Sequence, residues 1–166
     1  MHSRIYELKK NKEDENNLKE TSIECSDMDR YGIDYVAEMD ASDTANSIEW
    51  LKGCYQDAIE IDITAGTLRF TDPKKLMRSS FSEFQEALKN LSEMTIDDFV
   101  KEYHENDIMK GIGFAMYQLN NAYDDHSGFY IYTENGLKPL NAFVRGFVGD
   151  ITEQTFYIGN VLDYHC

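Results

Sequence analysis

The clearest alternation of apolar and polar residues lies in the stretch EIDITAGTLRFTD. Apolar side chains occupy every second position over 59–63 and again at Leu68 and Phe70. A period of two is typical of a half-buried strand, and the intervening Thr-Ala-Gly-Thr can form a turn. The pattern therefore predicts a β-hairpin whose outward face carries Glu60 and Asp62.

Apolar residues spaced by three or four predict several helices. The most regular set is Phe81, Phe84, Leu88 and Leu91, in a stretch opened by Asp72-Pro73. Proline at a first helical position sacrifices no hydrogen bond, so this helix is expected to start there. The other predicted helices are one capped by Ser42 or Asp43, one capped by Thr95, one capped by Asn106 and continuing to Ala122, and a short one in PLNAFVRGF.

Further strands are expected near both ends of the chain and in its last third. These segments are SRIYELK, SGFYIYTENG and TFYIGNVLDYH, whereas 31–39 fits either a helix or a strand. The polar run from Lys9 to Glu20 is expected to be a mobile loop. The aggregate prediction is one α+β domain spanning residues 1–166, with a small, mostly antiparallel sheet and about four or five packed helices.

Composition places the chain among folded proteins. Of its 166 residues, 42% are hydrophobic and 13% aromatic, which is too apolar for a disordered chain. There is no apolar run long enough for a transmembrane helix, and the first ten residues lack the apolar core of a secretory signal. The three cysteines have no metal-like spacing, so reduced thiols in a cytoplasmic protein are expected.

Charge is distributed unevenly. The formal net charge is −15, and residues 13–62 hold fifteen acids against three bases, a net −12. Such a field repels nucleic acid and anionic membranes and attracts basic protein surfaces. A simpler interpretation is that the charge only keeps the protein soluble.

No motif indicates catalysis or a bound cofactor. Asp124, Asp125 and His126 are consecutive and point in different directions, so a polar loop after a helix explains them better than a metal site. Phosphate-binding loops, zinc-protease signatures and nucleophile elbows are absent from the sequence. We therefore expect a non-enzymatic protein without cofactor or metal; a small enzyme or ligand-binding domain is the alternative.

The leading hypothesis is an acidic binding surface. Carboxylates held in a fixed array can occupy a basic groove that normally receives phosphates, and interleaved tyrosines add rigid contact area. The expected contact residues are Asp27, Asp29, Tyr31, Asp34, Tyr35, Asp40, Asp43, Glu60 and Asp62, with Asp98, Glu102 and Glu105 as a second patch. The expected partner is a basic protein, such as a nuclease or another nucleic-acid-binding enzyme.

In size and composition the chain resembles the small acidic inhibitors that bacteriophages and mobile elements direct against host defence nucleases. Anti-restriction and anti-CRISPR proteins are examples, and immunity proteins that neutralise nuclease toxins share the profile. The resemblance implies inhibition by nucleic-acid mimicry or by steric blocking. It is one of profile, and no residue role is transferred from it.

Overall fold

A computed structural model describes residues 2–14, 17–101, 111–125 and 128–166. The chain divides into two compact units. Unit 1 comprises Met1–Leu76 and His126–Cys166, and unit 2 comprises Met77–Asp125. Each unit is described by itself, and the single domain expected from the sequence stays a prediction.

Unit 1 is built on a mixed sheet in which all pairs but one are antiparallel. Seven strands form it in the order β3-β4-β7-β1-β5-β6, with β2 paired to β7 off this path, and only β1 and β5 run parallel. The strands are β1 (His2–Lys9), β2 (Tyr35–Glu38), β3 (Ile59–Asp62), β4 (Thr67–Phe70), β5 (Tyr130–Thr133), β6 (Gly136–Pro139) and β7 (Thr155–His165). The α+β class is confirmed, and the sheet is larger than the small one expected.

The described residues contain seven α-helices and two short 3-10 helices. These are η1 (Glu20–Ser22), α1 (Cys25–Tyr31), α2 (Ala41–Cys54), α3 (Pro73–Leu76), α4 (Arg78–Ser92), α5 (Ile96–Phe99), α6 (Ile112–Asp124), α7 (Leu140–Arg145) and η2 (Ile151–Glu153). The hairpin β3–β4 and helix α7 lie where the hydrophobic pattern placed them. Pro73 begins the short helix α3, and the apolar set from Phe81 to Leu91 lies on a separate helix, α4, that begins at Arg78. Thr95 caps α5, since its hydroxyl accepts a hydrogen bond from the backbone N–H of Asp98.

Other boundaries differ from the sequence-based expectation. The ambiguous segment 31–39 contains the end of α1 and the whole of β2. Helix α2 is capped by Asp40, whose carboxylate accepts from Asp43 N at 2.8 Å, so neither Ser42 nor Asp43 is the cap. Helix α6 follows Gly111, while the expected cap Asn106 lies outside the described residues.

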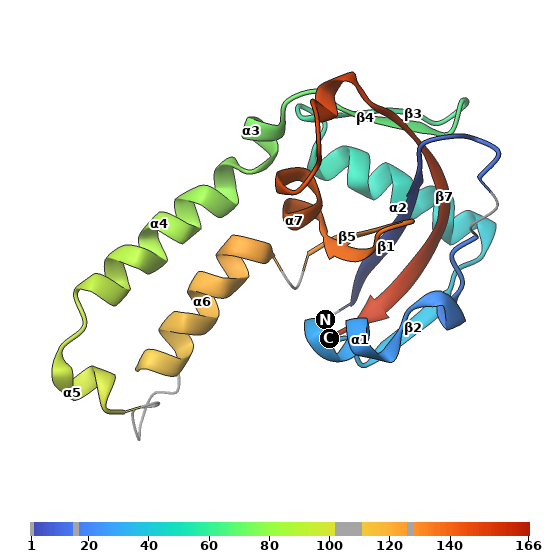
Figure 1. Ribbon diagram of the computed structural model, residues 1–166. Helices are drawn as coiled ribbons and strands as arrows, with labels where there is room; N and C mark the ends of the chain where they lie inside the picture. The colour runs from blue at the N-terminus through green and yellow to red at the C-terminus, as the bar shows by residue number, and fades with distance from the viewer. Residues whose placement is uncertain (1, 15–16, 102–110, 126–127) are drawn as a thin grey trace. The chain divides into compact units, whose positions relative to one another are not determined.

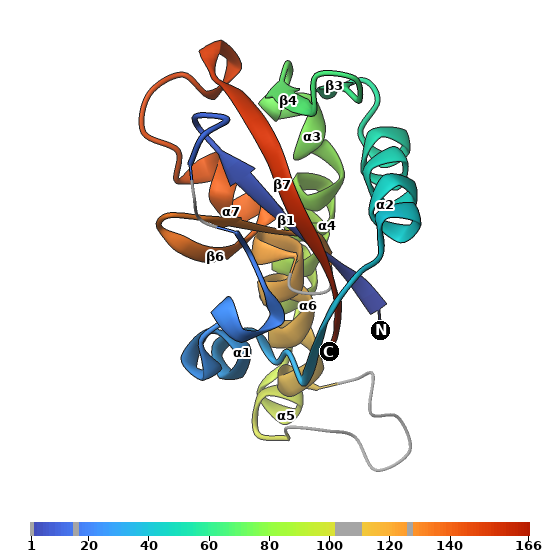
Figure 2. The ribbon, with the colours of Figure 1, turned by 90° about the vertical axis from the view of Figure 1, so that its right-hand side faces the viewer.

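Helices cover both faces of the sheet in unit 1 (Figures 1 and 2). On one face, Ile5, Tyr130 and Leu162 form a buried cluster that helix α1 covers through Met28 and Tyr31. Tyr6 projects from the opposite face towards α2, where its hydroxyl donates to the Ser47 carbonyl at 2.7 Å. Burial raises the pKa of the Tyr6 hydroxyl above its ordinary value. Helix α7 packs on this second face, because Phe143 contacts Phe70 and Phe156.

Strand β7 organises the sheet. Strand β1 pairs along one of its edges, from Lys9↔Tyr157 to His2↔His165. The other edge receives β4 at Thr155–Tyr157 and β2 at Leu162–His165. Because a strand rises about 3.3 Å per residue, β2 and the β3–β4 hairpin lie at opposite ends of β7. Figure 1 shows this separation.

A bulge in β7 lies opposite a buried carboxylate on β1. The pairing shifts register between Tyr6 and Leu8, which leaves Gly159 and Asn160 opposite Glu7. Glu7 is only 2% exposed and accepts hydrogen bonds from Asn160 N at 2.9 Å and Leu18 N at 3.0 Å. The glutamate thus ties the segment before η1 to the centre of the sheet.

Unit 2 contains α4, α5 and α6. Helices α4 and α6 pack antiparallel, with small residues such as Ala87 and Ala115 buried and the rings of Phe84 and Tyr123 6.0 Å apart. Phe81, which the helical spacing placed on the apolar face of α4, is 59% exposed. No helix of the described chain has the length and apolar character needed to cross a membrane.

Candidate functional site: an acidic rim and an aromatic pocket

The predicted contact residues Asp27, Asp29 and Tyr31 lie on α1. Asp29 is exposed, whereas Asp27 is half-buried and its Oδ2 faces Gly136, where an added Cβ would lie 3.8 Å away. Tyr31 stacks edge-on against Tyr130 at 5.2 Å and donates its hydroxyl to the Leu137 carbonyl. Asp29 is therefore available for contact, while Tyr31 mainly anchors the helix to the sheet.

Asp34 directly precedes β2, and Tyr35 is the first residue of that strand. The Asp34 carboxylate is 65% exposed and contacts Nδ1 of His165 at 2.8 Å. Tyr35 is 52% exposed and is paired in register with His165, on the sheet face opposite to α1. A second histidine, His2, stacks near His165 with ring centroids 5.0 Å apart.

Asp40 and Asp43 lie at the amino end of α2, which covers the same face as Tyr35. Both are exposed. The cap hydrogen bond fixes the Asp40 carboxylate, and Asp43 occupies the first turn, where the helix dipole favours an anion. The structure thus gives these two acids a defined local geometry.

Together α1, β2, the start of α2 and the residues beside them carry seven acids between positions 24 and 43, and we term this set the acidic rim. It consists of Glu24, Asp27, Asp29, Asp34, Glu38, Asp40 and Asp43. Arg30 is the only Lys or Arg in the segment 24–43, and its guanidinium lies over the Tyr31 ring at 5.3 Å. Within the described chain, Asp34 is the one rim residue in an ion pair, and its partner is a histidine.

The structure does not bring Glu60 and Asp62 into this rim. Both lie on β3, at the far end of β7 from β2. Glu60 is paired with Arg69 across the hairpin at 3.4 Å, and Asp62 accepts from Ala65 N in the turn. Both carboxylates therefore interact within the β3–β4 hairpin itself.

The second predicted patch is described only in part. Asp98 lies in unit 2, where its carboxylate accepts from the Thr95 backbone and hydroxyl in a capping box. Glu102 and Glu105 lie outside the described residues. Asp98 belongs to unit 2 and the acidic rim to unit 1, so the two sets of acids are described separately.

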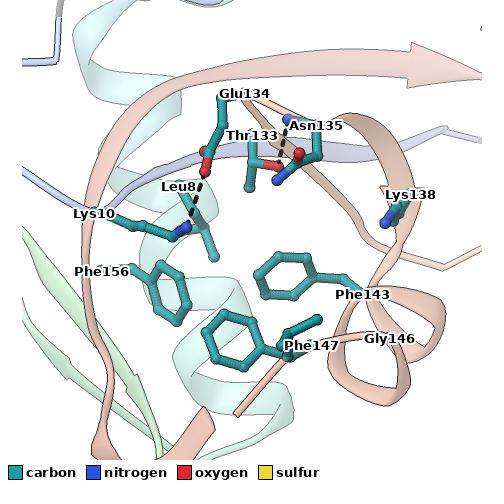
Figure 3. Close-up of a pocket in the computed structure, with 11 residues that line it drawn as sticks. Leu8, Lys10, Thr133, Glu134, Asn135, Lys138, Phe143, Gly146, Phe147 and Phe156 are labelled. Carbon is teal, nitrogen blue, oxygen red and sulfur yellow. Dashed lines mark hydrogen bonds and ion pairs between the residues drawn. The ribbon is translucent and has the colours of Figure 1, made fainter.

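A separate cavity of about 330 Å³ opens in unit 1 between the end of β1, the β5–β6 hairpin and α7. Figure 3 shows its apolar wall, formed by Leu8, Phe143, Phe147 and Phe156. The three rings lie edge to face, with centroids 5.7 to 6.1 Å apart. We term this cavity the aromatic pocket.

Polar groups surround the opening of the aromatic pocket. Lys10 and Glu134 form an ion pair at 3.0 Å on one side, and Lys138 lies on the other (Figure 3). In the part of the chain that the structure describes, Lys138 makes no ion pair. A second hollow of about 340 Å³ adjoins the pocket and shares Leu8, Lys10 and the Glu134 side chain with it.

Sequence reasoning missed this pocket. Helical spacing placed Phe143 and Phe147 on one face of a short helix, but nothing in the sequence indicated that Leu8, Lys10 and Phe156 would meet them. Their convergence depends on the parallel pairing of β1 with β5 and the antiparallel pairing of β1 with β7. Both pairings join segments more than a hundred residues apart.

Among the described residues, no three His, Cys, Asp or Glu side chains converge as metal ligands. Asp124 ends α6 and Asp125 forms its left-handed cap at φ 54°, as expected for a polar loop after a helix. His126 lies outside the described residues. Cys25 and Cys54 are exposed thiols.

Neither a family model, nor a curated protein, nor a solved structure matches this chain.

Proposed function

We propose that this chain is an acidic binding protein whose acidic rim occupies a basic surface of a nucleic-acid-handling protein, as an inhibitor of the anti-defence or nuclease-immunity kind. The observation that carries the proposal is the charge of the rim. It holds seven carboxylates and one arginine within twenty residues, and only Asp34 is ion-paired in the described chain. Structural acids are normally neutralised locally, whereas these remain available to cations outside the chain.

The local structure of the rim supports this proposal. Acids that mimic phosphates must be held in place before binding, because ordering them on contact costs conformational entropy. Helix α1, strand β2 and the capped start of α2 hold the rim backbone, and the pairing of β2 with β7 fixes it to the sheet. Tyr35 contributes an exposed ring beside these acids.

A matched pair of variants tests the rim. The rim variant carries Asp29→Asn, Asp34→Asn, Asp40→Asn and Asp43→Asn, and the control variant carries Glu83→Gln, Glu86→Gln, Glu93→Gln and Asp97→Asn in unit 2. Four removed carboxylates change the formal charge from −15 to −11 in both variants. Asparagine retains the capping ability of residue 40, so the fold of α2 is preserved.

The assay measures DNA or RNA cleavage by a panel of purified basic nucleases, including restriction enzymes, CRISPR effectors and nuclease toxins. We expect the wild-type chain and the control variant to inhibit one class, and the rim variant to lose that inhibition. Raising salt from about 0.1 M to about 1 M shortens the screening length from about 10 Å to about 3 Å and should release the complex. Equal inhibition by both variants, or no inhibition of any class, contradicts the proposal.

A further inference from the structure

The aromatic pocket is independent of the acidic rim in both position and chemistry. It lies against α7 and the β5–β6 hairpin, and its wall is made of phenylalanine rings. Phe156 and Leu8 are 1% and 2% exposed, so they form a rigid base beneath the cavity. Phe143 and Phe147 are held in edge-to-face contact with Phe156, which fixes the shape of the wall.

The opening carries a small net positive charge in a strongly acidic protein. Its charged lining residues are Lys10, Lys138 and Glu134, a local net of +1, whereas the whole chain carries −15. Glu134 neutralises Lys10, so the ammonium of Lys138 is the cation without an ion pair in the described chain. A ligand that placed an anionic group there would gain a charge-assisted hydrogen bond.

An exposed apolar side chain also lies at this opening. Val148 lines the cavity after α7 and is 94% exposed, more than any other large apolar side chain in the described chain. A bound apolar molecule would cover it and remove that area from water. The side chain amide of Asn135 lies nearby as a further hydrogen-bonding group (Figure 3).

We propose that the aromatic pocket is a binding site for a small organic anion with a flat, apolar body and a single acidic group. The body packs on Phe147 and Phe143, and the acidic group contacts Lys138. A volume of about 330 Å³ suits a ligand with one or two fused rings and lies at the lower end of small-molecule sites.

Naphthoate and its uncharged analogue naphthamide serve as probes, added to the full chain labelled with ¹⁵N. Amide chemical shifts identify the site, and titration gives the dissociation constants. We expect saturable one-to-one shifts at Asn135, Phe147 and Val148, with naphthamide binding about threefold more weakly than naphthoate because it lacks the charge.

Three variants assign the contacts. Lys138→Ala should weaken naphthoate binding about threefold and leave naphthamide unchanged, whereas Lys74→Ala, an exposed lysine on α3, should change neither. Phe147→Ala should weaken both probes. Val148→Ser should do the same, and because that side chain is exposed the variant stays informative if the Phe147 variant fails to fold.

Three results would overturn the proposal: no saturable shifts, shifts confined to unit 2, or equal binding of both probes that is unaffected by Lys138→Ala. Rim variants should bind naphthoate as the wild type does, which separates failure of this proposal from failure of the inhibitor proposal.

Discussion

Acidic side chains occur in two contrasting regions of unit 1. At the β7 bulge, Glu7 is buried and receives hydrogen bonds from Leu18 N and Asn160 N, with the Lys9 ammonium 3.5 Å away. In the acidic rim, every acid except the half-buried Asp27 is exposed, and only Asp34 makes an ion pair in the described chain. The same chemical group is part of the scaffold in the first region and is presented to solvent in the second.

The contrast shows why acidic composition alone does not define a binding surface. A buried charge is retained only when donors and cations satisfy it, and removing one partner is costly. An exposed carboxylate contributes little to folding, so its accumulation in one segment calls for a different explanation. Stability measurements distinguish the two kinds of acid, and Trp50 is a convenient reporter because it is the only tryptophan and packs on Phe129 in unit 1.

The largest effect is expected for Glu7→Ala. The change leaves the buried Leu18 N–H and the part-buried Asn160 N–H without their acceptor and opens a cavity, so the free energy of unfolding should fall by about 3 kcal/mol or more. Urea denaturation followed by Trp50 fluorescence measures it. Glu7→Gln keeps the volume and one acceptor, and it should cost less. A loss below about 0.5 kcal/mol for Glu7→Ala would remove the distinction between the two regions.

The second-largest loss in the free energy of unfolding is expected for Gly159→Ala. A Cβ at this position would lie 2.1 Å from Oε2 of Glu7, so the carboxylate would have to move from its hydrogen bonds. We expect a loss of about 2 kcal/mol in the same denaturation assay. Gly53→Ala is the control, because its Cβ meets nothing within 4 Å inside α2, and it should stabilise by up to about 1 kcal/mol. If Gly159→Ala lowers the free energy of unfolding equally in the wild type and in the Glu7→Ala variant, the clash with Glu7 is not the cause of the loss.

Asp40 occupies an intermediate position, since it belongs to the rim and also caps a helix. Asp40→Ala removes the acceptor for Asp43 N and should cost about 1 kcal/mol of unfolding free energy. Asp40→Asn preserves the cap and should lower the free energy of unfolding by only about 0.3 kcal/mol. Thermal denaturation of the two variants separates the capping role from the charge. Equal losses would show that the charge, and not the cap, stabilises α2.

The smallest effect on stability is expected for Asp29→Asn and Glu24→Gln. These rim acids have no ion pair in the described chain, so each change should alter the free energy of unfolding by less than about 0.5 kcal/mol. The same denaturation series measures it. A loss comparable to that of Glu7→Ala would mean that the rim acids are structural, which would weaken the case for an external partner.

Local patterns were sufficient to predict most of the secondary structure. Period-two alternation located β3 and β4, and helical spacing located α4 and α7. Over residues 31–39 the apolar spacing fits both a helix and a strand, and the segment contains the end of a helix, a turn and a strand. Short elements of this kind carry too few residues for a period to decide between helix and strand.

The candidate sites depended much more on long-range pairing. The concentration of acids in the N-terminal third is a property of the sequence. Their separation into the acidic rim and the β3–β4 hairpin is decided by the tertiary structure. Glu60 and Asp62 are separated from the rim because β4 and β2 pair with different ends of β7.

By itself the sequence determined the α+β class, the positions of the strongest helices and strands, and the excess of negative charge. Only the tertiary structure decided that Glu7 is buried opposite Gly159, and that Lys10, Lys138 and Phe156 surround one cavity. Local propensity and periodicity act over a few residues, whereas strand register and side-chain convergence are set by packing between segments that are distant in the chain.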